Sequence, residues 1–203
     1  MTFHKNTQIT LLTNSDQVND KTNSIRTPLF DELPPQVVAD LRTDHAGEVG
    51  AVNIYKGVLF FARDPKLRAF AERHLATEES HLALIKEWLM PKHYSHLLPL
   101  WRISGFLTGA LPALFGARAV YATIEVVETF VDQHYEHQVQ TLELNHGSID
   151  LLETLKSCQA DEVSHRNEAA LARGSLKIPL FLACWCAVVS WGSRIAVTIC
   201  RYI

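Results

Sequence analysis

Two short stretches of the chain carry a glutamate followed three residues later by a histidine. The first is Glu78-Glu-Ser-His81 and the second is Glu162-Val-Ser-His165. On an α-helix, residues three apart lie on one face about one turn apart, so each pair directs a carboxylate and an imidazole toward one point. In four-helix bundles that bind two iron or manganese ions, two helices each supply such a pair and the other two each supply one inward glutamate. The spacing therefore predicts a two-metal site if two further glutamates are present.

Glu48 and Glu128 are the predicted single glutamates. Each is followed seven residues later by a tyrosine, Tyr55 or Tyr135, which is two turns along the same helical face. Glu125 competes with Glu128, because the two residues lie on nearly one face, and the offset to Tyr135 favours Glu128. The two halves of the chain thus repeat one layout, which predicts a pseudo-symmetric bundle.

A cluster of four buried carboxylates requires a cation, because buried unpaired charges are strongly disfavoured. Two divalent ions balance four carboxylates and two neutral imidazoles, and the mixed oxygen and nitrogen ligands suit iron or manganese better than zinc. Structural zinc would favour thiolates, and no cysteine shares the pattern. The predicted ligands are Glu48, Glu78 and His81 for one ion and Glu128, Glu162 and His165 for the other, with Glu78 and Glu162 as bridges.

Residues around the predicted ligands have both structural and functional interpretations. Ligating histidines usually donate their second ring nitrogen to a carboxylate or carbonyl, and Asp161 and Asp44 are candidates for that contact. We expect Asp161 either to reach His81 or to be a solvated surface residue. His45 either faces the site or is a hydrogen-bonded core residue. The two tyrosines, Tyr55 and Tyr135, either fill the core or hydrogen-bond to a ligand carboxylate.

Other histidines are predicted to lie outside the site. Glu143 and His146 also match the spacing, but they precede Gly147, where a helix is expected to end, so this pair is predicted to be a chance match. The residues interpreted from spacing alone as surface or core are His74, His93, His96, His134 and His137.

Four long helices are expected to position these residues. Pro34-Pro35 begins one that runs to about Ala62, and Asp64-Pro65 caps and begins a second that ends at Pro91. The short turn makes these two helices antiparallel neighbours. A third is expected over 118–144, and Gly147-Ser148 begins a fourth that ends near Gly174.

Two apolar segments lie outside this pattern. The first, 103–117, is uncharged between Arg102 and Arg118 and contains Gly and Pro. The second, 178–193, is uncharged between Lys177 and Arg194. Both are expected to be too short to span a bilayer, which takes about 20 apolar residues.

The composition indicates one domain. The chain has 203 residues, of which 47% are hydrophobic, and a net charge of −3 with scattered basic residues, which argues against nucleic-acid binding. The four cysteines show no disulfide framework, so they are expected to be reduced. Residues 1–30 are rich in Asn, Thr and Ser and lack a secretory signal, so we expect a disordered tail before a single domain over 31–203.

With these residues in place, the chain resembles the demethoxyubiquinone hydroxylase family of ubiquinone biosynthesis, the 2-polyprenyl-3-methyl-6-methoxy-1,4-benzoquinol monooxygenases. The resemblance extends from about Leu41 to the C-terminus. Its most specific motif is Arg42-Thr-Asp-His-Ala-Gly-Glu-Val-Gly50. It also includes the two Glu-x-x-His pairs, Val127-Glu128 and His134-Tyr135.

The resemblance implies an all-α, ferritin-like four-helix bundle with a di-iron carboxylate centre and two additional short apolar helical segments. It implies an enzyme that uses O2 and NADH-derived electrons to hydroxylate the ring of a prenylated quinol. The six ligands predicted from spacing fall on the positions of the iron ligands in the family. The resemblance also places His134 and Tyr135 near the site as catalytic residues.

A prenyl tail is insoluble in water, so the resemblance further implies that the enzyme meets its substrate at a membrane surface, with the apolar segments partly inserted. The expected location is the cytoplasmic face of a bacterial inner membrane, or otherwise the matrix face of the mitochondrial inner membrane. A homo-oligomer and contacts with other ubiquinone-biosynthesis proteins are also expected. Two alternatives use the same residues: an iron-oxidising protein of the ferritin or rubrerythrin type, and a non-enzymatic membrane-associated helical scaffold whose glutamates pair with arginines.

Overall fold

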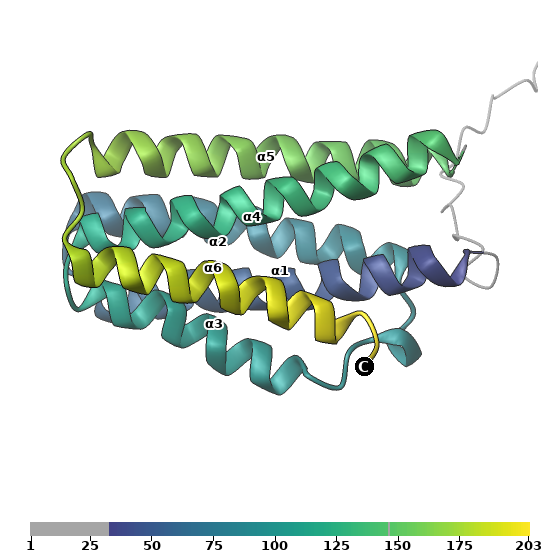
Figure 1. The fold of residues 1–203 in the computed structure, drawn as a ribbon, viewed down its shortest axis with the longest axis horizontal. Coiled ribbons are helices and arrows are strands. Elements are labelled where there is room, and N and C mark those ends of the chain that lie inside the picture. The colour runs from purple at the N-terminus through teal and green to yellow at the C-terminus, as the bar shows by residue number, and fades with distance from the viewer. Residues whose placement is uncertain (1–32, 146) are drawn as a thin grey trace, which may run out of the picture.

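The computed structural model describes residues 33–145 and 147–203, and all of its regular elements in that part of the chain are helical. The predicted tail over 1–30 and the residue His146 lie outside the described residues. The elements are α1 Pro35–Phe61, α2 Pro65–Trp88, the 3-10 turn η2 Pro91–His93, α3 Leu98–Ala113, α4 Ala117–Leu144, α5 Ile149–Arg173 and α6 Leu180–Cys200 (Figure 1).

Three helix boundaries have the predicted capping residues, whereas α2 ends at Trp88, before the predicted Pro91. The Asp64 side chain accepts from the backbone N–H groups of Lys66 and Leu67 at 2.8 and 2.9 Å, and Ser148 accepts from Leu151 N–H at 3.3 Å. These contacts satisfy amide groups that have no partner within the first turn of a helix. Gly174 ends α5 at φ +76°, a left-handed conformation that glycine adopts without a steric penalty.

The chain is built from two three-helix halves. In each half the first two helices, α1 with α2 and α4 with α5, pack as an antiparallel hairpin, and the apolar third helix packs on the first. The two hairpins form the predicted four-helix bundle, while α3 and α6 lie along the same side of it (Figure 1). The predicted repeat therefore includes the apolar helices as well as the ligand-bearing ones.

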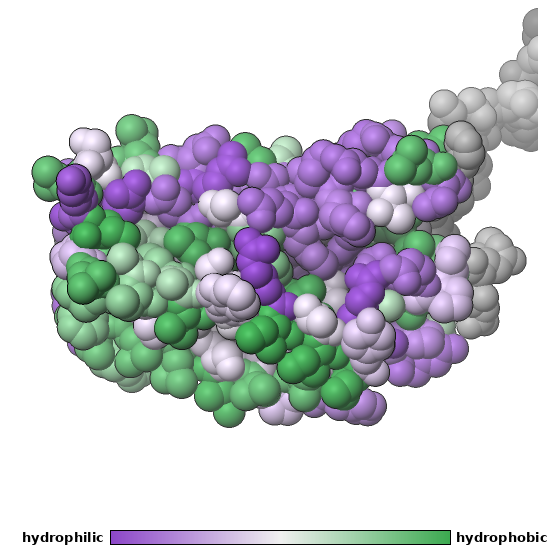
Figure 2. Space-filling model, in the orientation of Figure 1, coloured by the Kyte–Doolittle hydropathy of each residue, from purple (hydrophilic) through white to green (hydrophobic). Residues whose placement is uncertain are grey.

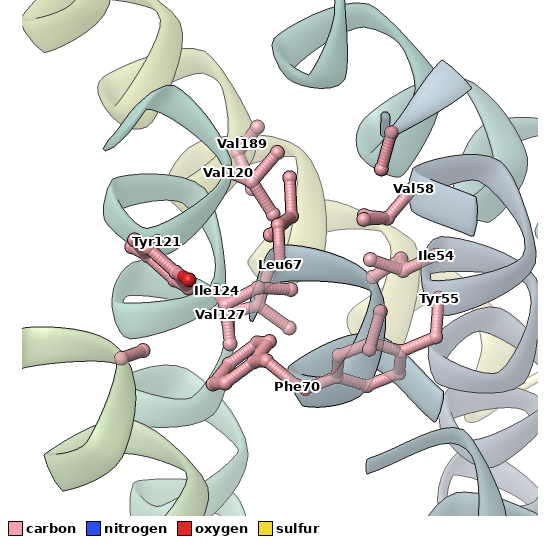
Figure 3. Packing of buried hydrophobic residues seen from close by; sticks show 13 residues of the cluster. Ile54, Tyr55, Val58, Leu67, Phe70, Val120, Tyr121, Ile124, Val127 and Val189 are labelled. Atoms are coloured by element: carbon pink, nitrogen blue, oxygen red, sulfur yellow. The ribbon is translucent and has the colours of Figure 1, made fainter. Parts of the chain in front are cut away.

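Apolar clusters fill the bundle on both sides of the predicted ligands. One cluster includes Tyr55, Phe70 and Ile124 from three different helices, and Figure 3 shows these side chains directed toward one another. A second includes Leu41 and Leu155. Packed apolar side chains fix the rotation of each helix, and that rotation decides which polar residues point inward.

The helices α1 and α3 approach one another through glycines. A Cβ atom on Gly109 would lie 1.9 Å from the Ile54 carbonyl oxygen, and one on Gly57 would lie 2.1 Å from the carbonyl oxygen of Phe106. No side chain larger than hydrogen fits between backbones this close. Gly105 and Gly109 therefore allow the continuous helix α3 to lie against α1, whereas Gly116, at φ +98°, lies between α3 and α4.

The second apolar segment is longer than predicted. We expected it to end at Arg194 and to be short, but α6 continues through Arg194 to Cys200 and has 21 residues. By length and composition alone α6 could cross a membrane. The prediction was wrong because a single arginine on an exposed side of a helix does not end the helix.

Candidate metal centre

The six predicted ligands converge at the centre of the bundle. Each is 6% exposed or less. Their donor atoms form two groups within 4.8 Å, and Glu78 and Glu162 belong to both groups. The first group is completed by Glu48 and His81, the second by Glu128 and His165. This is the arrangement predicted from the spacing, with the same two carboxylates between the two halves.

Several inward-facing atoms of these residues are buried without a hydrogen-bond partner. The Nδ1 atom of His81 lies 3.0 Å from Glu162 Oε1, and Nδ1 of His165 lies 3.1 Å from Glu78 Oε1, without hydrogen-bonding geometry. Buried polar atoms are rarely left unpaired. The unpaired atoms are Glu48 Oε2, Glu78 Oε1, His81 Nδ1, both carboxylate oxygens of Glu162, and His165 Nδ1. Buried oxygen and nitrogen atoms grouped in this way fit a bound cation.

Burial and mutual repulsion raise the pKa of three of the carboxyl groups. Burial and the charge of Glu162 raise the pKa of Glu48 to about 7 and hold those of Glu78 and Glu128 well above the usual range. Burial also acts to raise the pKa of Glu162, but the two histidines outweigh it and lower that pKa to about 2. Burial lowers the pKa of His81, but the facing carboxylates raise it to about 9. Divalent cations would relieve the same repulsion.

The outer nitrogen of His81 has the predicted carboxylate partner. Its Nε2 atom lies 3.1 Å from Asp161 Oδ2, which leaves Nδ1 directed into the centre. The corresponding prediction for Asp44 was wrong, because Asp44 Oδ1 instead lies 3.1 Å from His134 Nε2 and accepts from the Gln138 amide at 2.6 Å. Asp44 of α1 and His134 of α4 thus link these two helices.

The two tyrosines cross between the halves of the bundle. Tyr55 of α1 donates to Glu128 of α4 at 2.9 Å, and Tyr135 of α4 donates to Glu48 of α1 at 2.6 Å. Both tyrosines are 1% exposed or less. The interpretation in which each tyrosine hydrogen-bonds to a cluster carboxylate is confirmed, and each bond links one half to the other.

The spacing argument missed two polar residues behind the cluster. His74 was interpreted as a surface or core residue, and Glu168 was not considered. His74 lies 3.1 Å from the Tyr55 hydroxyl and 2.9 Å from Glu168 Oε2. A signal was present in the sequence, because His74 precedes Glu78 by four residues and shares its helical face.

His45 occupies neither of the expected environments. It is 1% exposed and stacks on Tyr94 at 3.8 Å, but neither ring nitrogen has a hydrogen-bond partner. Burial lowers the pKa of its ring to about 4, which favours the neutral form. It also lies in neither group of donor atoms.

Two glutamates that the sequence did not favour as ligands form ion pairs outside the cluster, whereas His134, interpreted from spacing alone as surface or core, lines the cavity beside it. Glu125 pairs with Arg173 at 2.5 Å, and Glu143 with Lys156 at 2.5 Å. The four cysteines are free thiols, as expected.

A cavity of about 340 Å³ adjoins the cluster. Most of its wall comes from α1, α3, α4 and α6, and the wall includes Glu48, Glu128, Glu78 of α2 and Glu162 of α5. His134 and Tyr135 also line it, while most of the remaining wall is apolar. Representative apolar lining residues are Ile54, Trp101, Val131, Trp185, Val189 and Val197. The arrangement can therefore bring an apolar molecule directly to the polar centre.

Comparison of the sequence with known proteins identifies the family of the chain. The sequence pattern of the family described as "Ubiquinone biosynthesis protein COQ7" matches residues 36–200, which extend from the first turn of α1 to the end of α6 and include every residue of the cluster. The chain belongs to this family. Membership confirms the resemblance, and the helical bundle formed by the described residues agrees with it.

Individual relatives in the family are similar over about three quarters of their length. The "3-demethoxyubiquinol 3-hydroxylase" of Rhodospirillum rubrum is 34% identical over 160 residues, 74% of this chain and 74% of the relative. The "NADPH-dependent 3-demethoxyubiquinone 3-hydroxylase, mitochondrial" of Dictyostelium discoideum is 32% identical over 158 residues, 75% of this chain and 72% of the relative. The human protein of the latter name is 29% identical over 161 residues, 77% and 73% of the two chains.

Proposed function

We propose that this member of the COQ7 family uses two iron ions and O2 to hydroxylate the ring of a prenylated demethoxy-benzoquinol in ubiquinone biosynthesis. Family membership and the names of its relatives support the class of reaction and the pathway. The observation that carries the proposal is the largely apolar cavity whose wall includes four buried glutamates, three of which, Glu48, Glu78 and Glu162, have carboxylate oxygens without a hydrogen-bond partner.

Six residues would hold the metal. Glu48 and His81 would bind one ion, and Glu128 and His165 would bind the other. Glu78 and Glu162 belong to both donor groups and would bridge the two ions. When bound, such a centre supplies the electrons and the coordination positions that O2 activation needs. The protein orients the ligands through Asp161, Tyr55 and Tyr135.

The cavity suits a ring with an apolar tail. Its carboxylate wall offers hydrogen-bond acceptors to the hydroxyl groups of a quinol, while the wall from α3 and α6 contacts apolar groups. His134 and Tyr135 line the cavity on the α4 side, where they would contact the ring, and Asp44 orients His134. These contacts support the catalytic assignment of both residues.

The electron donor is proposed to be a reduced nicotinamide dinucleotide. We expected NADH, whereas the Dictyostelium and human relatives are named as NADPH-dependent. Comparing turnover with the two dinucleotides separates these donors.

We also propose that the protein lies on a membrane surface. Large apolar side chains are exposed on α3 and α6, among them Ile103 at 61% and Trp191 at 70%. Figure 2 shows the hydrophobic surface over the part of the molecule formed by these helices and the hydrophilic surface over α5. A helix that packs on α4 and lines the cavity suits partial insertion better than crossing the bilayer. The proposed location is the cytoplasmic face of a bacterial inner membrane or the matrix face of the mitochondrial inner membrane. The proposed partners of the protein are further copies of the same chain and other ubiquinone-biosynthesis proteins.

The activity is tested by complementation. In cells that lack the hydroxylase and accumulate the demethoxy precursor, expression of this chain should restore ubiquinone, measured by chromatography of the extracted quinones. Purified protein reconstituted anaerobically with Fe(II) should hold about two ions per chain. A folded protein without bound iron would end the di-iron proposal.

The two alternatives make different predictions. A ferritin-type protein would oxidise Fe(II) in many turnovers without any quinol, whereas the proposed enzyme requires quinol for sustained O2 consumption. A scaffold would neutralise its glutamates with arginines. Across the described helices, the ion pairs of Glu48, Glu78 and Glu162 are with histidines, and Glu128 accepts from Tyr55.

A further inference from the structure

A chain of side-chain contacts runs from the surface of the bundle to one half of the metal centre. It begins at Glu168 of α5, whose side chain is 41% exposed, and passes through His74 of α2 and Tyr55 of α1 to Glu128 of α4. The three contact distances are 2.9, 3.1 and 2.9 Å. One residue from each helix of the four-helix bundle therefore takes part.

His74 is the central residue of this chain. It is 2% exposed, and both of its ring nitrogens have a partner. Its ring also stacks on that of His165, with centroids 4.0 Å apart and an angle of 24° between the planes. His74 thus acts on two proposed ligands at once, on Glu128 through Tyr55 and on His165 by direct packing.

Both of these ligands belong to the same donor group. Glu128 and His165 occur in the second group, and neither occurs in the first. The outer contacts of the first group are separate, because His81 has Asp161 as its partner and Glu48 accepts from Tyr135. Contacts made by His74 therefore reach one metal position only.

The corresponding position in the other half of the bundle has no such residue. Four residues before Glu78 stands His74, whereas four residues before Glu162 stands Cys158, which is fully buried in an apolar cluster with Tyr135. The pseudo-symmetry of the fold therefore does not extend to the polar contacts that His74 makes. The asymmetry instead gives the two metal positions different surroundings.

We propose that Glu168, His74 and Tyr55 form a positioning arm that sets the orientation of Glu128 and His165, and so the affinity of one of the two metal positions. Glu168 fixes the ring plane of His74, because a carboxylate in contact with a ring nitrogen restrains rotation of the ring. Arg73 pairs with Glu168 and holds the outer end of the arm. This inference rests on the proposed metal centre and adds that its two positions are supported by different residues.

Metal stoichiometry of single variants gives the first test. His74→Phe keeps an aromatic ring against His165 but removes both polar contacts, and Tyr55→Phe removes only the hydroxyl. Each variant is expected to lower the affinity of one metal position for Fe(II) or Co(II) about 10–100-fold and to leave the affinity of the other position unchanged, as is typical when a hydrogen-bond partner of a ligand is removed. The readout is equilibrium competition with a chromophoric chelator, together with the metal content after dialysis. Tyr135→Phe is the matched variant, because Tyr135 donates to Glu48 of the first donor group, and it should lower the affinity of that metal position only.

Double variants identify which ion is affected. His74→Phe with Tyr55→Phe removes the same arm twice, so this protein should still retain one ion with little further loss. His74→Phe with Tyr135→Phe removes support from both positions, so this protein should lose both ions. Glu168→Gln, at the partly exposed end of the arm, is a milder variant that tests the proposal if His74→Phe does not fold.

Specific outcomes would overturn the proposal. Wild-type affinity for both ions in Glu168→Gln and Tyr55→Phe, or equal weakening of both ions in either variant, excludes a positioning arm for one position. A wild-type protein that binds no metal would instead refute the metal centre itself, so the two failures are distinguishable. Circular dichroism on each variant confirms that the helices are formed.

Discussion

Glu162 differs from the other three buried glutamates in the direction of its pKa shift. Burial acts to raise its pKa, but His165 and His81 lower it to about 2. The pKa values of Glu48, Glu78 and Glu128 are all raised, first by burial and then by the charge of Glu162. Glu162 is therefore the cluster carboxyl group that ionises most readily, because His165 and His81 favour its charged form. Metal binding must displace protons from the other groups.

The metal-free protein should lose stability as the pH rises from 6.5 to 9. The folded-state pKa of His81 is raised from 6.5 to about 9. Protonated His81 therefore stabilises the folded state fully below pH 6.5, and this stabilisation is lost between pH 6.5 and 9. The raised carboxyl pKa values act in the same direction. Burial lowers the pKa values of His45 and His74 to about 4, so their contributions are already complete above pH 6.5. We expect the free energy of unfolding to fall on the order of 1–3 kcal/mol, measured by urea titration.

The metal-loaded protein is the control for this pH dependence. Ligation requires deprotonated carboxylates and neutral ring nitrogens, so its stability should not fall over the same range. A metal-free protein that becomes more stable between pH 6.5 and 9 would contradict the protonation states inferred for His81 and Glu48.

Removal of one bridging or terminal ligand should abolish activity. Glu162→Ala or His165→Ala is expected to lower quinol hydroxylation by more than about 100-fold while far-UV circular dichroism stays largely helical, because the bundle is held by its apolar clusters. Glu143→Ala is the matched control, since Glu143 has the same spacing to a histidine but pairs with Lys156 on the surface. Retained activity in either ligand variant would refute the proposed ligand set.

At the scale of the elements, each half of the molecule attaches its apolar helix differently. The contact between α1 and α3 is made by backbones at glycines. The contact between α4 and α6 is made by side chains, including Leu182 and Cys186, and by a 2.9 Å bond from the Trp185 indole N–H to Thr123. Because both apolar helices line the cavity, the distance of each from the bundle affects the size of the cavity.

Two glycine substitutions should therefore have opposite effects. Gly109→Ala places a Cβ atom 1.9 Å from a carbonyl oxygen of α1, so the helices must separate, and we expect a loss of about 1–3 kcal/mol of unfolding free energy. Gly192→Ala in α6 meets no atom within 4 Å, and the higher helix propensity of alanine should stabilise the protein by up to about 1 kcal/mol. Chemical denaturation measures both, and equal effects would contradict the close packing of α3.

The whole molecule separates an apolar side from a polar one. The exposed apolar side chains of α3 and α6 lie on the side where both helices cover the cavity, whereas α5 contributes hydrophilic surface (Figure 2). A substrate with an insoluble tail could enter from a membrane through this side without crossing water. The location of the cavity and the location of the apolar surface support the same orientation on a bilayer.

Membrane binding should depend on the apolar side alone. Trp191→Glu on α6 introduces a charge at a 70% exposed position and should reduce flotation with liposomes several-fold. Leu171→Glu on α5 introduces the same charge at an 83% exposed position on the polar side and should leave flotation unchanged. Equal loss in both variants would show that net charge, rather than this surface, controls binding.

The sequence by itself was sufficient for the positions of the ligand-type residues. Spacings of three and seven residues place side chains on one helical face whatever the tertiary structure, so Glu78 with His81 and Glu128 with Tyr135 could be paired in advance. Helix ends at Asp64 and Ser148 were predictable for the same reason, because capping contacts are local.

Contacts between helices were decided only by the tertiary structure. The rotation and separation of packed helices directed Asp44 to His134 rather than to a cluster histidine, and joined His74 to Tyr55 and Glu168. The close approach of α3 to α1 at the glycines of α3 was likewise seen only in the tertiary structure. Such contacts depend on how all the apolar faces pack together, and no spacing along one helix contains that information.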